Sequence, residues 1–71
     1  MTENRREFEG VIEQELPRGL YAVRLDDGRQ ITATMTSRSR RHLVKIISGD
    51  RVLLEISEFD TSRGRIKARV S

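Results

Sequence analysis

The sequence predicts an all-β fold in which five short strands close into one small barrel. Three observations support this prediction: apolar and polar residues alternate over short stretches, turn residues separate these stretches, and only one segment has helical periodicity. No repeat, linker or low-complexity tract interrupts the chain. We therefore expect a single domain over residues 1–71, with residues 1–6 loosely attached.

The first predicted strand, Phe8–Leu16, places Phe8, Gly10 and Ile12 on one side. Gly10 would permit a bend or bulge where the barrel turns. The strand is expected to end at Pro17-Arg18-Gly19, because proline and glycine favour a turn.

The next two strands form a predicted hairpin. Leu20–Asp26 and Arg29–Thr36 flank Asp27-Gly28, a dipeptide whose residues both tolerate positive φ and therefore suit a two-residue turn. The second of these strands alternates cleanly. The residues expected on one side of it are Ile31, Ala33 and Met35.

A short helix is predicted between the third and fourth strands, over residues 37–47, where the apolar spacing changes. Ser37 suits the N-cap, and Gly49 can end the helix in the left-handed conformation. One apolar face of this helix would pack against the barrel. That face consists of Leu43, Ile46 and Ile47.

Two more strands follow. Arg51–Ser57 is the fourth, Phe59–Ser62 turns the chain, and Arg63–Val70 is the fifth. Alternation in the fifth strand sends inward Ile66, Ala68 and Val70. It sends outward Arg63, Arg65, Lys67 and Arg69. Three strands, a helix and two strands is the order of the five-stranded OB-fold Greek-key barrel, a fold that commonly binds nucleic acid.

The small size of the chain argues against an enzyme. A domain of this length buries only roughly 60% of the surface its unfolded chain exposes, which leaves little room for a deep substrate cavity. The sequence has no cysteine, which excludes disulfides and thiolate zinc sites, and we expect no metal or cofactor. Neither a signal peptide nor a membrane span is recognisable. We expect a cytoplasmic monomer.

The distribution of charge favours an RNA partner. Residues 1–36 carry five Arg and seven acids, net −2, whereas residues 37–71 carry nine Lys or Arg and four acids, net +5. Twelve of the fourteen basic residues are arginine. Its planar guanidinium suits phosphate contacts and stacking on bases.

Two groups of cations are candidate RNA-binding sites. The loop group consists of Arg38, Arg40, Arg41, His42 and Lys45. It contains no acid, and a polyanion would relieve its self-repulsion; the alternative is an idle solvated loop. The strand group consists of Arg63, Arg65, Lys67 and Arg69. Charges that merely protect a strand edge are the alternative there, but four cations exceed that need.

An open platform for stacking bases is not expected. The only aromatic residues are Phe8, Tyr21 and Phe59, and most should be needed for the core. Recognition would then depend on arginine, backbone and shape, which suits a structured RNA. Catalysis is not expected either, because His42 is the only histidine and has no nucleophile to activate.

Six short segments carry a resemblance to a known family: Glu9-Gly10-Val11-Ile12, Leu16-Pro17, Val23-Arg24-Leu25-Asp26-Asp27-Gly28, Ile31-Thr32-Ala33, Ser48-Gly49-Asp50-Arg51-Val52 and Asp60-Thr61-Ser62-Arg63-Gly64-Arg65-Ile66. Each segment is weak alone, but their order and spacing are specific. From about Phe8 to Arg69 the chain thus resembles the bacterial-type translation initiation factor one, an S1-like OB-fold family. The absence of long tails argues against the archaeal and eukaryotic relatives.

The resemblance implies a non-enzymatic factor that binds the small ribosomal subunit at its decoding (A) site, blocks premature entry of elongator tRNA and assists initiation factors two and three. It implies insertion into the ribosomal RNA by loop residues Arg38, Ser39, Arg40, Arg41 and His42. It implies contact with the RNA backbone by strand residues Arg63, Arg65 and Arg69.

This chain departs from the family pattern in the same loop. The family tends to have glycine, methionine and asparagine where this chain has Ser37, Ser39 and His42, and often an aromatic residue in place of Leu43. Two other functions remain as alternatives: a general cold-shock-like RNA chaperone, and an SH3-like barrel that docks a peptide.

Overall fold

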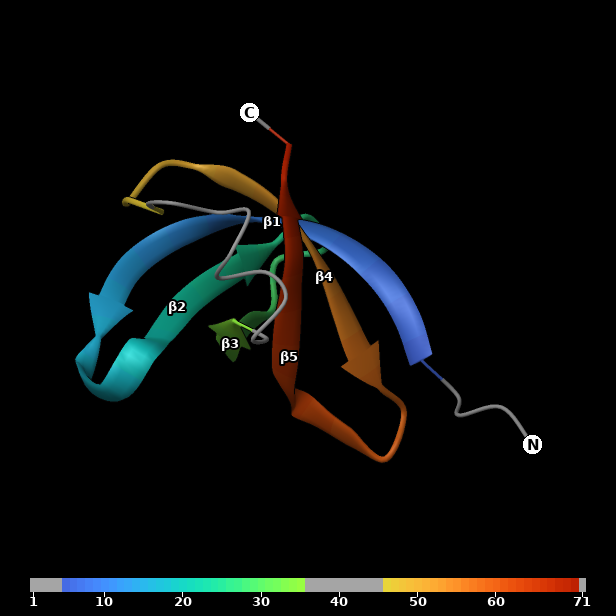
Figure 1. Ribbon diagram of the computed structural model, residues 1–71. Helices are drawn as coiled ribbons and strands as arrows, with labels where there is room; N and C mark the ends of the chain where they lie inside the picture. Colours follow the sequence, from blue (N-terminus) through green and yellow to red (C-terminus); the bar gives the residue numbers. More distant parts are fainter. Residues whose placement is uncertain (1–4, 36–45, 71) are drawn as a thin grey trace.

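The computed structural model describes residues 5–35 and 46–70, which form a closed barrel of five strands (Figure 1). In chain order the elements are β1 (Arg5–Leu16), the 3₁₀ turn η1 (Pro17–Gly19), β2 (Leu20–Leu25), β3 (Gln30–Met35), β4 (Arg51–Ser57) and β5 (Asp60–Arg69). Around the barrel the strands run β1-β2-β3-β5-β4 and close back onto β1. Only β3 and β5 pair in parallel. The predicted five-stranded OB-fold barrel is confirmed.

β1 is a long, strongly curved strand that pairs with two neighbouring strands (Figure 1). Its first part pairs with β4 and its second part with β2, and the two pairings overlap at Gly10 and Val11. A Cβ at Gly10 would lie 2.7 Å from the carbonyl oxygen of Arg24, so only glycine permits this close approach. The register shift itself lies farther along, between Ile12 and Gln14, and not at Gly10.

The β2–β3 hairpin differs from the predicted two-residue turn. The backbone N–H of Leu25 donates to the carbonyl of Arg29, and the N–H of Gly28 donates to the carbonyl of Leu25. The loop therefore has three residues, and only Gly28, with φ of 95°, has the left-handed conformation. This arrangement is the common alternative in which a tight turn is followed by a glycine bulge.

The turn between β4 and β5 is shorter than predicted. β5 begins at Asp60, so only Glu58 and Phe59 lie between the strands. Asp60 already pairs with Ser57, and the side chain of Asp60 accepts hydrogen bonds from the N–H and the hydroxyl of Ser62. The sequence placed Asp60 and Ser62 in a turn. These local hydrogen bonds instead hold both residues in an extended strand.

The predicted helix falls mostly on residues 36–45, which lie outside the described residues. Of its expected apolar face, Ile46 is buried with 3% exposure, but Ile47 is 55% exposed. The prediction was wrong for Ile47. Neither residue is helical. The chain turns instead between Ile47 and Asp50, whose carboxylate accepts from the Ile47 N–H, and Gly49 has the expected left-handed φ of 96°.

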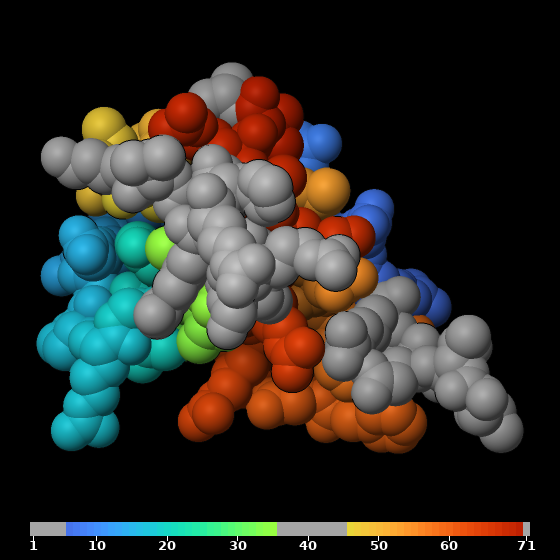
Figure 2. Space-filling view, viewed as in Figure 1, coloured from blue at the N-terminus to red at the C-terminus, as the bar shows by residue number. Residues whose placement is uncertain are grey.

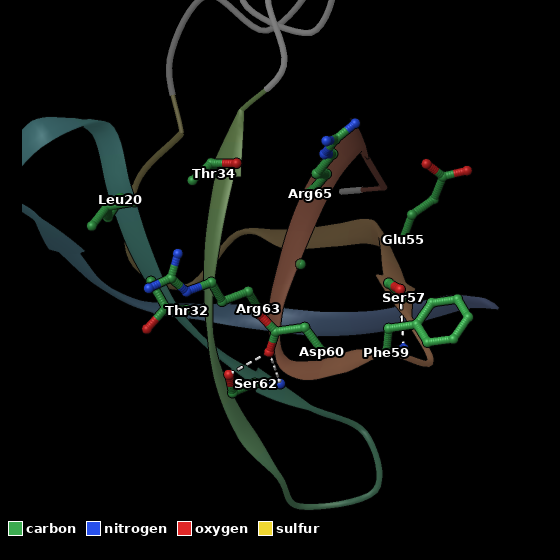
Figure 3. A pocket seen from close by; sticks show the side chains of 11 residues that line it. Leu20, Thr32, Thr34, Glu55, Ser57, Phe59, Asp60, Ser62, Arg63 and Arg65 are labelled. Carbon is green, nitrogen blue, oxygen red and sulfur yellow. Dashed lines mark hydrogen bonds between the residues drawn. The ribbon is translucent and has the colours of Figure 1, made fainter. Parts of the chain in front are cut away.

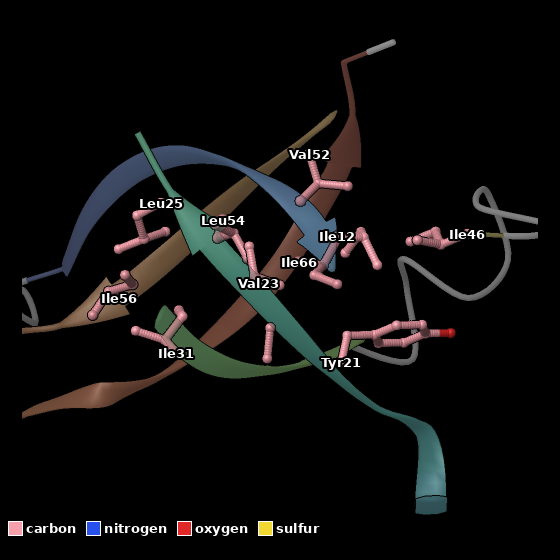
Figure 4. Close-up of a cluster of buried hydrophobic side chains, with 11 residues drawn as sticks. Ile12, Tyr21, Val23, Leu25, Ile31, Ile46, Val52, Leu54, Ile56 and Ile66 are labelled. Carbon is pink, nitrogen blue, oxygen red and sulfur yellow. The ribbon is translucent and has the colours of Figure 1, made fainter. Parts of the chain in front are cut away.

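The core fills the interior of the barrel (Figure 4). Its members are Ile12, Tyr21, Val23, Leu25, Ile31, Ala33, Ile46, Val52, Leu54, Ile56 and Ile66. Phe8 and Met35 pack against this cluster and are partly buried. The alternation predicted for the first and third strands is therefore confirmed.

β5 breaks its predicted alternation after Ile66. Leu54 pairs with Ile66 while the adjacent Leu53 pairs with Ala68, so Lys67 is an extra residue in the strand, a β-bulge. A bulge reverses which side the following residues face, and Ala68 is exposed rather than inward. Val70, which lies beyond the end of the strand, is exposed too. The prediction for these two residues was wrong because the bulge intervenes.

Candidate nucleic-acid interface

A surface groove crosses the outer side of β3, β5 and β4 (Figure 3). Its volume is about 820 Å³. Strand pairing aligns one row of residues across it: Leu20, Thr34, Arg65 and Glu55. The remaining lining residues are Thr32, Ser57, Phe59, Asp60, Ser62, Arg63 and Gly64. We refer to this surface as the groove.

Two arginines of the predicted strand group lie along the middle of the groove. Arg63 and Arg65 are exposed and project from the same side of β5, about 6–7 Å apart along the strand. Gly64 between them is buried and faces the core. Within the described part of the chain, neither arginine makes a side-chain hydrogen bond or ion pair. The charge of Arg63 acts on the nearby carboxylate of Asp60 without a direct ion pair.

The other two cations of the strand group are placed differently. Lys67 is exposed, but its Nζ lies 2.6 Å from a carboxylate oxygen of Glu7 and 3.4 Å from one of Glu55. The hydrogen bond to Glu7 and the nearby charge of Glu55 raise the pKa of Lys67. Arg69 lies 3.9 Å from the carboxylate of Asp50. All four cations reach solvent as predicted, but they do not form one continuous row.

The groove also contains two carboxylates, Asp60 and Glu55, which lie to either side of its arginines. Asp60 accepts from the hydroxyl of Ser62 at 2.7 Å and from its backbone N–H at 3.2 Å. These bonds, with the charge of Arg63, lower the pKa of Asp60, so this carboxyl is ionised at neutral pH. Glu55 lines the groove on β4. The cationic part of the groove therefore lies along β5, between Thr32 and Thr34 on β3 and Glu55 on β4.

Phe59 is the functional candidate that the sequence analysis missed. Its side chain is 84% exposed at the β4–β5 turn, where it lines one end of the groove (Figure 3). Its backbone N–H donates to the hydroxyl of Ser57 at 3.1 Å, which fixes the turn beneath the ring. The two other aromatic residues do serve the core, as expected: Tyr21 is buried and Phe8 partly buried. A side chain at the tip of a two-residue turn cannot reach the core. The sequence could have indicated the exposure of Phe59, because this residue lies just beyond the end of the fourth strand.

The surface view in Figure 2 places β5 and the β4–β5 turn on one visible face of the molecule. The loop group, and Ser39 between its first two members, lie outside the described residues. The ends of that loop are described. Thr34 pairs with Arg65 and Met35 with Ile66, so the segment leaves β3 directly beside the arginines of the groove. Ile46 anchors its other end in the core.

The outer surface around β1 contrasts with the groove, because Arg24, Arg51 and Lys67 contact acids there. Arg51 contacts the carboxylates of both Glu9 and Asp26, and these hydrogen bonds, the one to Asp26 foremost, raise its pKa. Arg24 bonds Glu13 at 3.1 Å, and Glu13 also accepts from Gln30. We refer to this region, with the Lys67–Glu7 pair, as the β1 flank.

The fold and the groove define a small OB-fold protein with an arginine-lined surface, a class that binds nucleic acid. Among the described residues, no helix has the length and apolar character to cross a membrane. Comparison with known proteins identifies the family. The family model described as Translation initiation factor 1A / IF-1 matches residues 1–71, and the chain belongs to this family.

Individual relatives agree with this assignment. The chain is 41% identical to the chloroplastic translation initiation factor IF-1 of Ceratophyllum demersum, over 99% of this chain and 91% of that protein. The solution structure of translation initiation factor IF-1 from the Wolbachia endosymbiont of Brugia malayi has a TM-score of 0.78 at 36% identity, covering 96% of this chain and 80% of that one. The resemblance to bacterial-type initiation factor one is thereby confirmed. Translation initiation factors of this family are a non-enzymatic kind of protein.

A more distant structure shares the fold alone. YjeQ from Thermotoga maritima has a TM-score of 0.73 at 21% identity. The match covers 93% of this chain but only 23% of YjeQ. The barrel described above is therefore also a building block of a larger protein.

Proposed function

We propose that this protein binds the small ribosomal subunit at its decoding (A) site through ribosomal RNA, blocks premature entry of elongator tRNA and assists initiation factors two and three. It would act as one domain and as a monomer in the cytoplasm. The protein works by occupancy, and no bond is made or broken. The family assignment supports the link to initiation.

The observation that carries the proposal is the pair of arginines in the groove. Arg63 and Arg65 lie beside the point where the cation-rich loop leaves the barrel, so one face offers two sources of phosphate contacts. In this proposal the loop residues Arg38, Ser39, Arg40, Arg41, His42 and Lys45 contact decoding-site RNA. Lys67 and Arg69 contribute only after exchanging Glu7 and Asp50 for phosphate.

Co-sedimentation with purified small subunits across a salt series tests the proposal. The large subunit and an unstructured RNA serve as controls. We expect selective binding to the small subunit that weakens with salt, because each phosphate contact releases counterions. An initiator-complex assay with and without factors two and three then tests the cooperation.

A second function gains support from one observation. The exposed ring of Phe59 is a feature of single-strand binders, which an RNA chaperone of the cold-shock kind would use. Equal, salt-sensitive binding to both subunits and to unstructured RNA would favour this alternative and contradict the proposal above.

A further inference from the structure

The first half of β1, Arg5–Glu9, pairs with β4 on one side and is drawn in blue at the right of Figure 1. On its other side β2 begins to pair only at Gly10, and no strand of the described residues lies alongside Arg5–Glu9 there. We infer that this free edge binds an extended basic peptide of a partner protein by strand addition, with one apolar side chain of the peptide seated beside Phe8. The inference goes beyond the proposed function, because it concerns a protein ligand on a surface other than the groove.

Backbone hydrogen bonds show which groups of β1 point to the free side. Ile12 bonds the turn before β4, whereas the carbonyl of Glu9 accepts from the N–H of Asp26, just after β2. Successive residues of a strand direct their backbone groups to opposite sides, so Arg5 and Glu7 point the same way as Glu9. No described strand uses the N–H and carbonyl groups of these two residues on that side. They can pair with a further strand, and such main-chain bonds give strand addition its affinity.

A hollow of about 340 Å³ lies beside this edge. Phe8 and Ile56 line it with apolar groups, and the guanidinium of Arg29 lies over the Phe8 ring, 5.3 Å from its centre. A peptide residue that pairs with Phe8 would place its side chain on the same face of the sheet as Phe8. That side chain would enter the hollow. The volume is at the lower end of the range for ligand pockets, roughly 300–1,000 Å³, and suits one side chain rather than a larger ligand.

The charges inside and outside the edge differ, and together they define the peptide. In the hollow the charges are matched, because Arg6 lies 2.8 Å from Glu58 and Arg29 bonds Asp27, so an uncharged side chain is favoured. The described side chains on the outward side are four acids and two cations, a net charge of −2: Glu7, Glu9, Asp26, Glu55, Lys67 and Arg51. The peptide residues before and after the apolar one face this side. Basic residues are favoured at both positions, and a polyanion is repelled.

The edge is also accessible. Exposed strand edges are commonly protected by charged side chains that stand in the way of another strand. Here Glu7 lies 2.6 Å from the Nζ of Lys67 on β5, and Glu9 lies 3.0 Å from Arg51 on β4. These ion pairs draw both carboxylates toward β4 and β5, away from the backbone groups that a peptide would use.

A peptide of the sequence Lys-Thr-Lys-Leu-Lys-Thr-Lys, with acetylated and amidated ends, tests the inference. It is titrated into the ¹⁵N-labelled natural protein while the backbone amides are followed by NMR. We expect the largest shifts at Glu7 and its neighbours, and binding about 10-fold weaker or less when serine replaces the leucine, because serine fills the hollow with a smaller and more polar side chain. Absence of shifts at the edge, or largest shifts at Arg63 and Arg65 in the groove, would overturn the inference.

Methylation of the peptide nitrogens separates strand addition from general attraction between charges. Only alternate N–H groups of an added strand face the neighbouring strand. We therefore expect opposite results from two peptides of equal charge, one methylated on the lysine nitrogens and the other on the threonine and leucine nitrogens. One set should abolish binding and the other should leave it intact. Similar binding by both peptides would show that the backbone of the peptide does not pair with β1.

Two variants at one position test the edge from the side of the protein. Glu7→Pro removes an N–H that points to the free side, a place where a strand tolerates proline, and it leaves the bonds to β4 in place. Glu7→Ala is the matched control, because it loses the same carboxylate and keeps the N–H. We expect Glu7→Pro to bind the leucine peptide at least about 10-fold more weakly than Glu7→Ala does, since strand addition depends on that N–H. Equal affinity of the two folded variants would overturn the inference, and the methylated peptides decide the matter if Glu7→Pro does not fold.

Discussion

The β1 flank and the groove both carry charged residues on the same barrel, but they use them differently. On the flank, Arg51 is held between Glu9 and Asp26, and Lys67 bonds Glu7 while its Nζ also lies 3.4 Å from Glu55 at the edge of the groove. In the groove, Arg63 and Arg65 make no ion pair within the described part of the chain. Cations already matched by acids offer little to a polyanion, because binding would have to break existing pairs.

The dividing point lies within a single strand. The bulge at Lys67 separates the part of β5 that faces the groove from the part that turns toward the flank and the end of the barrel. A row of alternating cations in the sequence thus contributes to two surfaces that differ in how their charges are paired. The number of cations along a strand does not by itself indicate which of them are matched by acids.

The largest effect is expected on the free energy of unfolding, at two buried glycines: Gly10 lies beneath the flank and Gly64 beneath the groove. A Cβ added to Gly10, beneath the flank, would lie 2.7 Å from the carbonyl oxygen of Arg24, whereas at Gly64, beneath the groove, the nearest atom, at 2.9 Å, ends the side chain of Ile31. We expect Gly10→Ala to cost about 2–3 kcal/mol in free energy of unfolding and Gly64→Ala about 1–2, because a side chain yields more easily than backbone.

Chemical denaturation of both variants measures this difference. Gly28→Ala is the control for backbone conformation: an added Cβ there would meet no atom within 4 Å, so only the φ of 95° opposes the substitution. Equal costs at Gly10 and Gly64 would mean that the floor of the groove is as rigid as the flank. That result would contradict the comparison at the level of packing.

The next effect concerns binding. Arg65→Ala should weaken binding to small subunits by about 1–3 kcal/mol, the usual range for an arginine contact to nucleic acid. Lys67→Ala should cause a smaller loss, because Lys67 must first leave Glu7 and Glu55. Sedimentation at matched salt compares the two variants. A greater loss for Lys67→Ala would place the RNA on the flank.

The sequence alone predicted what depends on local alternation. The fourth strand was placed to the residue, and the inward residues of the first and third strands were identified, because a two-residue period shows directly which face is buried. The bulge at Lys67 was out of reach, since it depends on the register between two strands. The ion pair between Lys67 and Glu7 joins residues 60 positions apart and leaves no local pattern.

The candidate site was predicted in part for the same reason. Arg63 and Arg65 followed from alternation, but Phe59 did not, because its hydrophobicity suggested the core. Only the short turn between β4 and β5 explains its exposure. The assignment of the loop residues depends on resemblance and charge alone, and it stays a prediction.

The smallest effect is expected at Asp60, the carboxylate at the turn end of the groove. The hydrogen bonds from Ser62 lower the pKa of Asp60 in the folded protein below its value in the unfolded chain, about 3.9. Such a group adds stability above the unfolded pKa and loses it as pH falls through the folded pKa. Ser62→Ala removes the hydroxyl donor and should move the pKa of Asp60 back toward its ordinary value.

An NMR titration of the Asp60 carboxyl in both proteins measures the change, and Asp27, whose pKa is lowered by Arg29 on the β2–β3 hairpin, is the internal control. We expect the stability difference between the two proteins to be present at pH 7 and to shrink as Asp60 is protonated. An unchanged titration would show that Ser62 does not hold this charge.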